Sequence, residues 1–253
     1  MNNQITRDQF NKQAERYANW SMVTSDQKLK TYFNYCKIKP HDTLLDVACG
    51  PGDFAIYSAT MIAQSAGVDI SDNEIEIGRS ISEKMGLKNV SFDRADVENL
   101  PHADHSFSVV TCRYAFHHFI NAEVVFKEMI RCCQPQGKIG IVDITSYEDP
   151  EVNQFFERFD KLVDVSHNKT RDKHFFNQLF IDHKVQKTNE IMMNVDLNVQ
   201  EYIDHAVQSE ENKLEIQDLL SAGLKNEKLK NFLFMKQGEL HYRRHVYLTR
   251  GTR

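Results

Sequence analysis

The sequence predicts an α/β protein built on a doubly wound, mostly parallel sheet with helices on both faces. Short apolar runs alternate with helix-like segments between residues 43 and 144. The run at 106–113 is continuous and apolar enough to be buried on both sides, as parallel strands usually are. Strands that alternate with helices imply βαβ units joined by right-handed crossovers.

The first part of the chain carries the clearest local signals. Residues 1–40 are helix-like and amphipathic, and Pro40 ends them. The predicted elements then follow as a strand at 43–48, a helix over about 53–63, a strand ending at 68–70, a helix stopped by Gly86, and strands at 90–94 and 106–113. Ser71 to Glu74 has the capping-box pattern, in which two side chains each cap the other residue's backbone amide.

The remaining elements are predicted with the same reasoning. They are a helix over about 122–132, a turn at Pro135–Gly137, a strand at 138–144, two phenylalanine-rich helices around 155–162 and 175–180, a strand at 191–197, a helical insert over about 199–222, and a strand at 241–249. We expect a single domain over residues 1–253. Its parts are an N-terminal helical segment at 1–40, a core at 41–146, and cap helices plus final strands at 147–253.

Composition indicates an ordinary globular protein of the cytoplasm. The net charge is -5, so no overall positive field attracts nucleic acid, and nucleic acid is not an expected partner. No apolar run is long enough to cross a bilayer, so no membrane contact is expected. The 5 cysteines show no Cys-x-x-Cys spacing. We expect them to be reduced thiols and expect no metal site.

A loop with two glycines joins the first strand to the next helix. Gly50 and Gly52 would let the backbone approach a ligand beside the amides of a helix N-terminus. Asp69 ends the next strand, where a carboxylate can accept hydrogen bonds from ribose hydroxyls. The stretch from Gly50 to Ala55 also fits the dinucleotide fingerprint, so a nicotinamide-dependent oxidoreductase is an alternative at this point.

Three features favour S-adenosylmethionine over a dinucleotide. Asp46 lies in the strand just before the loop, where it can face a cationic ligand, and Asp96 follows the third strand, where an adenine amino group needs an acceptor. The loop itself has no Arg or Lys to pair with a pyrophosphate. Tyr35 and Lys39 have the Tyr-x-x-x-Lys spacing of short-chain dehydrogenases, but such an enzyme would need the pair far downstream of the first strand.

Five longer motifs follow one another in order. They are LLDVACGPGDFA at 44–55, GVDIS at 67–71, ADVENLP at 95–101, FSVVTCRYAFHHF at 107–119 and QPQGKIGIVD at 134–143. Together they resemble the class I S-adenosylmethionine-dependent methyltransferases, in the group related to ubiquinone and menaquinone biosynthesis. The resemblance implies a seven-stranded Rossmann-like sheet with one antiparallel strand near the edge. Two departures are Ala48 in place of the first glycine of Gly-x-Gly-x-Gly, and Gln134–Gly137 in place of a Lys-Pro-Gly-Gly turn.

The resemblance implies S-adenosyl-L-methionine as the cofactor. The residues expected to bind it are Tyr17, Asp46, Gly50, Gly52, Asp69, Ile70, Asp96, Val97 and Arg113. The two glycines would line its methionine part, and Asp69 would hold its ribose hydroxyls. Asp96 would meet the adenine amino group, the Val97 amide a ring nitrogen, and the carbonyl of Cys112 or Arg113 the methionine ammonium.

The resemblance also makes residues 1–40 a lid over the cofactor. Phe10, Tyr17 and Trp20 match an aromatic segment that closes over the cofactor in many relatives. The second alternative, after the oxidoreductase, is a non-catalytic module that keeps such a cofactor pocket.

The acceptor side is less defined by sequence. A general base is needed only when the acceptor must lose a proton, and Tyr114, His117 and His118 after the fourth strand are the candidate catalytic residues. His167 and Asp160 are weaker candidates from the cap. The late basic residues Arg243, Arg244 and Arg250 would meet an anion or lie at solvated strand ends. The expected partner is a small-molecule methyl acceptor, methylated at O, N or C, and a homodimer is a further expectation.

Overall fold

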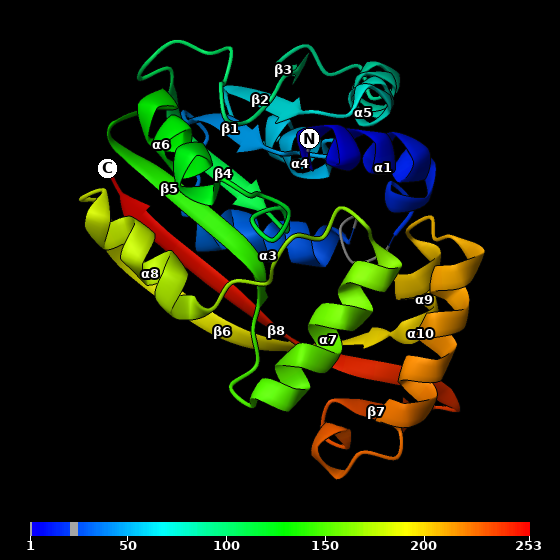
Figure 1. Cartoon of the computed structure of the whole chain (residues 1–253). Coiled ribbons are helices and arrows are strands. Elements are labelled where there is room, and N and C mark those ends of the chain that lie inside the picture. The colour runs from blue at the N-terminus through cyan, green and yellow to red at the C-terminus, as the bar shows by residue number, and fades with distance from the viewer. Residues whose placement is uncertain (1, 21–24) are drawn as a thin grey trace.

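One sheet organises the protein, as seen in a computed structural model that describes residues 2–20 and 25–253 (Figure 1). Its strand order is β3-β2-β1-β4-β5-β8-β6, and a short β7 pairs with β8. The strands are β1 Thr43–Val47, β2 Gln64–Asp69, β3 Val90–Arg94, β4 Phe107–Arg113, β5 Cys133–Thr145, β6 Gln186–Asn198, β7 Leu233–Lys236 and β8 Glu239–Thr252. β1 to β5 are parallel, and β8 runs antiparallel between β5 and β6. The predicted doubly wound sheet, with one antiparallel strand next to the edge, is confirmed.

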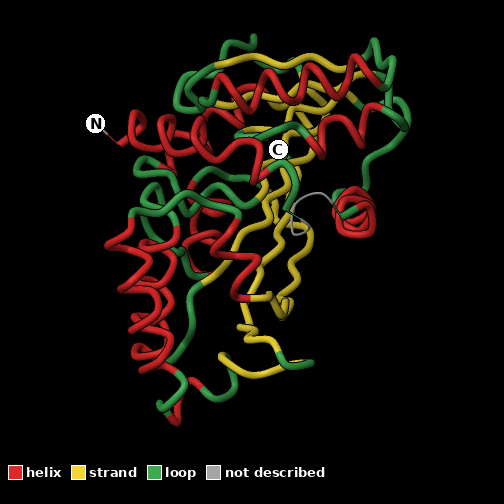
Figure 2. Tube along the Cα trace, turned by 90° about the vertical axis from the view of Figure 1, so that its right-hand side faces the viewer, coloured by secondary structure: helices red, strands yellow, loops and turns green. Residues whose placement is uncertain are grey.

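Helices cover both faces of this sheet. They are α1 Asn2–Tyr17, α3 Asp26–Tyr35, α4 Asp53–Ala59, α5 Asp72–Lys84, α6 Ala122–Cys132, α7 Pro150–Val163, α8 Lys173–Asp182, α9 Val199–Asp204 and α10 Glu210–Gly223. Successive strand residues point to opposite faces: Leu44 packs with Leu29 of α3 and Phe54 of α4, whereas Leu45 lies in the cluster that includes Phe126 of α6. In Figure 2, α3 lies across the strands from α7 and α10. Among the described residues, no helix is long and apolar enough to cross a membrane.

The cap helices pack on an extension of the same sheet. α7, α9 and α10 share a hydrophobic core with the first part of β8, which has 14 residues against 7 in β4. Their common core includes Phe156, Phe159, Val199, Ile216 and Tyr242. The predicted helical insert is therefore present, and it shares a core with the sheet. β7 lies outside every predicted element, because its four residues are too few to show a strand pattern.

Several predicted boundaries are wrong; β6, for example, begins at Gln186 rather than at 191. The helix expected over 53–63 ends at Ala59, because the amides of Met61 and Ile62 turn back to the Ser58 carbonyl and the Ile62 side chain is buried. The fifth strand begins at Cys133 rather than at 138. Its pairing with β4 is interrupted there, so the predicted turn at 135–137 lies inside the strand as an irregularity.

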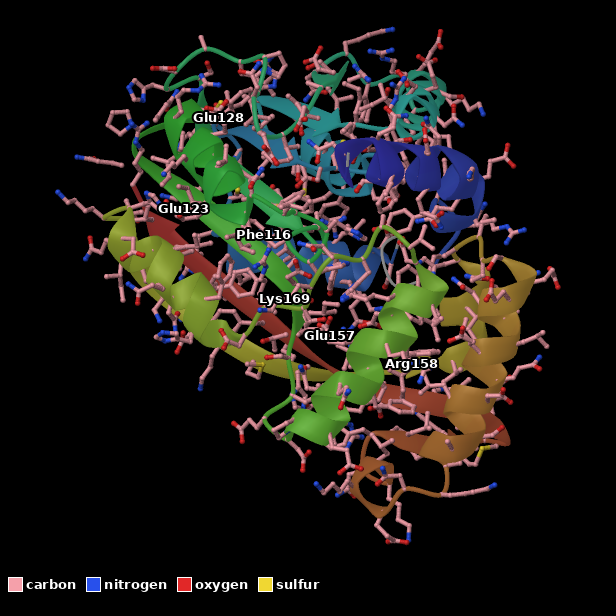
Figure 3. All side chains as sticks on the ribbon, in the orientation of Figure 1. Phe116, Glu123, Glu128, Glu157, Arg158 and Lys169 are labelled. Atoms are coloured by element: carbon pink, nitrogen blue, oxygen red, sulfur yellow. The ribbon has the colours of Figure 1, made fainter. Side chains whose placement is uncertain are left out.

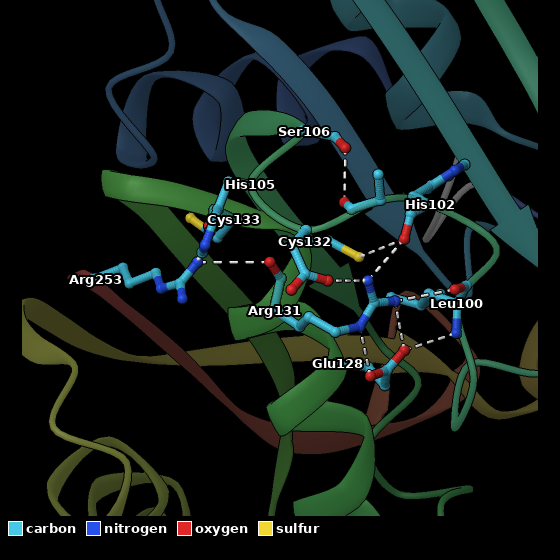
Figure 4. A network of polar contacts seen from close by, with 11 residues as sticks. Leu100, His102, His105, Ser106, Glu128, Arg131, Cys132, Cys133 and Arg253 are labelled. Carbon is cyan, nitrogen blue, oxygen red and sulfur yellow. Dashed lines mark hydrogen bonds and ion pairs between the residues drawn. The ribbon is translucent and has the colours of Figure 1, made fainter.

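Arg131 at the end of α6 holds the loop between β3 and β4 (Figure 4). Its guanidinium donates to the carbonyl oxygens of Leu100 and His102 at 3.0 and 2.7 Å, and it pairs with Asp104 and Glu128 at 2.8 and 2.7 Å. Glu128 also accepts from the Leu100 amide at 2.8 Å. This network fixes the loop that begins directly after β3, where one side of a cleft is formed.

Candidate functional site

The carboxyl ends of β1, β2 and β4 border a cleft of about 670 Å³, which we call the first cleft. Phe10 and Tyr17 of α1 are part of its wall, so α1 forms its roof. Figure 1 shows α1 beside α5 and α4 at this edge of the sheet. Ligands of open α/β sheets bind outside the carboxyl ends of the strands, which makes this cleft the first candidate site.

Most of the predicted site residues line the first cleft. They are Tyr17, Gly50, Asp69, Ile70, Asp96, Val97, Arg113, Tyr114 and His118. Asp46, Gly52 and His117 do not line it: Asp46 lines a smaller neighbouring space, Gly52 lies under the ring of Phe92, and His117 lines a second cleft.

The loop after β1 needs its glycines for two different reasons. Gly50 has φ +54°, and a Cβ there would stand 3.3 Å from Tyr17 Cε1, so a side chain would push against the roof of the first cleft. Gly52 has φ +80°, and its Cβ would stand 2.2 Å from Phe92 Cε1. Gly52 thus lets the loop pack on Phe92, and it does not line the cleft as predicted. Ala48 also has a positive φ, 54°, which costs a non-glycine residue some backbone strain.

Asp69 connects the loop to the start of α5. Its Oδ2 accepts a hydrogen bond from the Gly50 amide, and its Oδ1 accepts one from the Ser71 amide, both at 2.9 Å. Burial raises the pKa of Asp69, and these two hydrogen bonds oppose that change. Each carboxylate oxygen has a second lone pair, so Asp69 can still accept hydrogen bonds from a ligand in the first cleft.

Asp46 lies beneath the loop. Its side chain is buried and accepts a hydrogen bond from Thr111 Oγ1 at 2.8 Å. Burial raises its pKa to about 6, although the positive charge of Arg113 acts the other way. It lines the small space together with Tyr17 and Arg113, which also line the first cleft. Its negative charge is therefore near the cleft without forming its surface.

Glu74 differs from the capping-box prediction. Ser71 Oγ accepts from the Glu74 amide at 3.2 Å as expected, but the Ser71 amide donates to Asp69 and leaves no donor for the Glu74 side chain. That side chain turns inward and is fully buried. Among the described residues, neither of its oxygens has a hydrogen-bond partner. Burial, with Asp69 and Asp53 nearby, raises its pKa to about 9, so it is protonated at neutral pH.

Asp96 lies at the other side of the first cleft. Its Oδ1 accepts from the Glu98 amide at 2.9 Å, and its Oδ2 accepts from Asn3 Nδ2 at 2.6 Å. Asn3 lies at the start of α1, so this helix is tied to the loop after β3. Both Asn3 and Val97 are part of the cleft wall.

A second cleft of about 560 Å³ adjoins the first. The two share the wall residues Phe10, Tyr17, Tyr114 and His118. Tyr114 has φ +50°, which is rare for a bulky residue and is associated with functional sites. The strained residue therefore lies directly after β4, at the point where the clefts meet.

His117 and Asp143 form a carboxylate–histidine pair in the second cleft. His117 Nδ1 lies 2.6 Å from Asp143 Oδ1, and the His117 amide donates to Asp143 Oδ2 at 3.1 Å. A carboxylate only accepts, so Nδ1 carries the hydrogen and Nε2 is left to accept a proton when the ring is neutral. Burial alone would lower the pKa of His117, but the charge and hydrogen bond of Asp143 outweigh burial and raise it.

His118 has the opposite character. Its Nδ1 lies 3.1 Å from both the carbonyl oxygen and the hydroxyl of Ser166, and that hydroxyl donates to Asp164. Burial and the neighbouring His117 lower its pKa to about 3, so the ring is neutral near pH 7. The structure thus distinguishes the two histidines that the sequence left equivalent. His117 has a carboxylate partner, as a histidine that acts as a base often has, whereas His118 is held in the wall between the clefts.

The cap completes the second cleft with a third histidine. His167 lies 5.3 Å from His117 between ring centroids, and its Nε2 pairs with Glu157 at 3.5 Å. Burial opposes ionisation of Glu157, but His167 and Thr170 outweigh it and lower the pKa of Glu157 to about 2. Figure 3 shows Glu157 on α7 near the loop that carries Lys169, whose amide donates to the His117 carbonyl. The loop after α7 therefore positions the loop after β4.

α1 is fastened to the cap as well as to the core. Trp20 stacks on His205 with ring centroids 4.3 Å apart, and Arg16 donates to the Ala206 carbonyl at 3.1 Å. Gln13 donates to Asp164 at 3.3 Å. If α1 acts as a lid, its movement would consequently change the walls of both clefts.

Sequence reasoning missed several of these residues. Asp143 ends the last of the five motifs at the carboxyl end of a strand, and that position was a usable signal for a partner of His117. Tyr202 and His205 belong to the cap insert, which has no motif, so only the structure places them in the second cleft.

The sheet order, the antiparallel strand beside the edge and the clefts at the strand ends define the class of Rossmann-like methyltransferases. The chain matches the family model described as a methyltransferase domain over residues 38–238, and it belongs to that family.

Relatives agree with this assignment. The chain is 30% identical over 158 residues to YcgJ of Bacillus subtilis, described as an uncharacterized methyltransferase, covering 62% of each chain. It is 30% identical over 152 residues to a demethylmenaquinone methyltransferase of Lactobacillus johnsonii, covering 56% of this chain and 60% of the relative. These alignments span less than two thirds of either relative.

Solved structures share the fold. The crystal structure of Bacillus subtilis YcgJ superposes with a TM-score of 0.82 at 22% identity, covering 90% of this chain and 98% of that one. A geranyl diphosphate C-methyltransferase from Streptomyces coelicolor, in complex with geranyl diphosphate and S-adenosyl-L-homocysteine, superposes with a TM-score of 0.60 at 12% identity, covering 89% of this chain and 77% of that one.

Proposed function

We propose that the protein transfers a methyl group from S-adenosyl-L-methionine, bound in the first cleft, to a small-molecule acceptor in the second cleft. One observation carries the proposal: the clefts share the wall formed by Phe10, Tyr17, Tyr114 and His118. Ligands on the two sides of that wall would have reacting atoms next to one another. Such positioning supplies most of the catalysis in a displacement at a methyl group.

The first cleft fits this cofactor chemically. Asp69 keeps lone pairs for ribose hydroxyls, and Gly50 leaves room beneath Tyr17 that any side chain would fill. Asp96 and Asp46 place negative charge on two sides, which suits a cationic ligand. The Streptomyces coelicolor neighbour was crystallised with S-adenosyl-L-homocysteine, which supports the same class of ligand here.

When bound, the cofactor would supply an electrophilic methyl group on a sulfonium. The chain would contribute orientation, exclusion of water by α1, and a proton acceptor at His117 Nε2 for an acceptor that must lose a proton. Asp143 would hold that ring and favour its protonated form, as the raised pKa of His117 indicates. His118, kept neutral by burial, would pack between cofactor and acceptor.

The nicotinamide alternative finds no support. The hydroxyl of Tyr35, the tyrosine of the Tyr-x-x-x-Lys pair, lies 3.0 and 3.1 Å from the carbonyl oxygens of Asn189 and Leu248, which share its one hydrogen. It lines neither cleft. The structure therefore uses this residue to fasten α3 to the final strands.

Calorimetric titration with S-adenosylmethionine tests the cofactor assignment. Asp69→Asn should weaken binding about tenfold or more, because a charge-assisted hydrogen bond contributes roughly 1.5–3 kcal/mol. Asp93→Asn on the neighbouring strand is the control and should bind like the wild type. Unchanged affinity in a folded Asp69→Asn protein would show that this carboxylate does not hold the ligand.

Turnover is then tested with extracted metabolites and a labelled methyl donor. Transfer of label into a small molecule is expected from the wild type. Tight binding with no transfer to any metabolite fraction would favour the non-catalytic alternative.

A further inference from the structure

A buried ion pair forms part of the wall of the second cleft. Arg244 of β8 and Asp160 of α7 have side chains that are 2% and 0% exposed, with Arg244 Nη2 2.9 Å from Asp160 Oδ2. Arg244 lines the second cleft and not the first. The pair therefore belongs to the acceptor side of the site.

The two groups are close without being joined by a well-aligned hydrogen bond. Among the described residues, neither Arg244 Nη2 nor Asp160 Oδ2 makes an aligned hydrogen bond, although the two atoms lie 2.9 Å apart. Tyr202 donates its hydroxyl to the other oxygen of Asp160 at 2.9 Å, and the guanidinium lies 5.7 Å from the ring centre of Tyr147. Arg244 Nη2 carries two hydrogens, and the contact with Asp160 Oδ2 can use only one of them. A buried N–H without an acceptor costs free energy, so the second hydrogen, in a cleft wall, indicates a missing ligand atom.

The charge of the cleft limits what that ligand atom can be. The Arg244 guanidinium already lies beside the Asp160 carboxylate, and the rings of His117 and His167 already have Asp143 and Glu157 as partners. Asp164 adds a further acidic group to the wall. An anionic ligand would bring a second negative charge to a guanidinium that Asp160 already neutralises, and desolvating that charge would be unfavourable.

We propose that Arg244 binds an uncharged carbonyl oxygen of a planar methyl acceptor, and that Asp160 makes the site reject carboxylates. This inference rests on the proposed function, which places the acceptor in the second cleft. A carbonyl oxygen accepts a hydrogen bond from the guanidinium without adding charge. Trp20, Tyr202 and Tyr242 line the same cleft, and their flat rings favour a planar molecule.

Three probes of nearly identical shape test the proposal. Benzamide carries an uncharged carbonyl, benzoate an anion and benzamidine a cation. Each is titrated calorimetrically into the full-length protein, without cofactor, up to about 10 mM, because fragments of this size bind in the millimolar range. Benzamide should bind about tenfold more tightly than either charged probe. Equal or tighter binding of benzoate or benzamidine, or no binding of benzamide, overturns the proposal.

Variants then assign the effect to the pair. Arg244→Met should weaken benzamide binding about tenfold, whereas Arg243→Met, at the next position of β8 and paired with Asp196 near the surface, should leave it unchanged. Asp160→Asn leaves the guanidinium charge uncompensated, so benzoate should then bind about tenfold more tightly than to the wild type. Unchanged benzoate binding by Asp160→Asn overturns the role of Asp160.

The outcomes remain informative if one variant does not fold. Should Arg244→Met fail to show a cooperative melt, the wild-type probe series and Asp160→Asn still decide the proposal. The proposed function can be refuted independently of the carbonyl site. Loss of S-adenosylmethionine binding with an intact probe preference would remove the enzyme assignment and leave the carbonyl site, while the reverse result would remove only the carbonyl site.

Discussion

Substitution of Gly50 tests whether the loop after β1 forms the wall of a ligand site. Gly50 has φ +54°, and a Cβ there would stand 3.3 Å from Tyr17 Cε1. Gly86 has φ +70°, but a Cβ there would meet nothing within 4 Å. Gly86→Val therefore reproduces the backbone strain of Gly50→Val without its steric contact and is the matched control.

The two contributions can be estimated separately. A left-handed conformation costs an L-residue roughly 1–2 kcal/mol, so both variants should melt roughly 2–8 °C below the wild type. Only Gly50→Val adds atoms under Tyr17, where the Cβ is already closer than an ordinary contact. The two valine methyl groups must then displace this ring or occupy the first cleft. We expect the affinity for S-adenosylmethionine to fall at least about 100-fold, or roughly 3 kcal/mol.

Melting without ligand and calorimetric titration with S-adenosylmethionine measure the two effects on the same samples. Gly86→Val should lose stability and keep its affinity, whereas Gly50→Val should lose both. The reasoning is refuted if the affinity of folded Gly50→Val is within about threefold of that of Gly86→Val. The loop would then be a turn and not a ligand wall.

Three further predictions follow from the buried titratable groups and from the roof of the clefts. The pKa of Glu74 is raised from an ordinary 4.5 to about 9, so between these values the folded chain keeps a proton that the unfolded chain loses. The stability of the wild type should therefore fall as pH rises through this range. Glu74→Gln carries no such proton, so its advantage in melting temperature over the wild type should grow with pH. A constant difference across pH would contradict the buried acid. Asp143→Asn should lower the pKa of His117, because the effect of burial is then no longer opposed by the carboxylate. NMR titration measures this pKa, with His118, whose pKa is already low, as the internal reference. An unchanged pKa of His117 would exclude the pairing. S-adenosylmethionine should alter the fluorescence of Trp20, since its ring lies 6.1 Å from that of Tyr17 in the wall of the first cleft. Trp20→Phe should abolish the signal, and a flat titration despite measured binding would argue against coupling through α1.

The five motifs predicted the core well because each is a local arrangement. A strand, a tight loop and the following helix are contiguous in sequence, so the positions of Gly50, Asp69 and Asp96 at the carboxyl edge follow from the βαβ pattern alone. Even here, local reasoning failed for Gly52 and Glu74. Gly52 packs on Phe92 of β3, and the Ser71 amide that Glu74 was expected to cap donates instead to Asp69 at the end of β2.

The sequence by itself therefore determined the sheet, the family and the loops that border the first cleft. Only the tertiary structure decided the second cleft. His117 meets Asp143 from the next strand of the sheet, and Arg244 meets Asp160 across the cap. The physical reason is that these partners lie on different elements, so their distance and burial, and hence their charge, depend on how the elements pack. No periodicity within one segment carries that information.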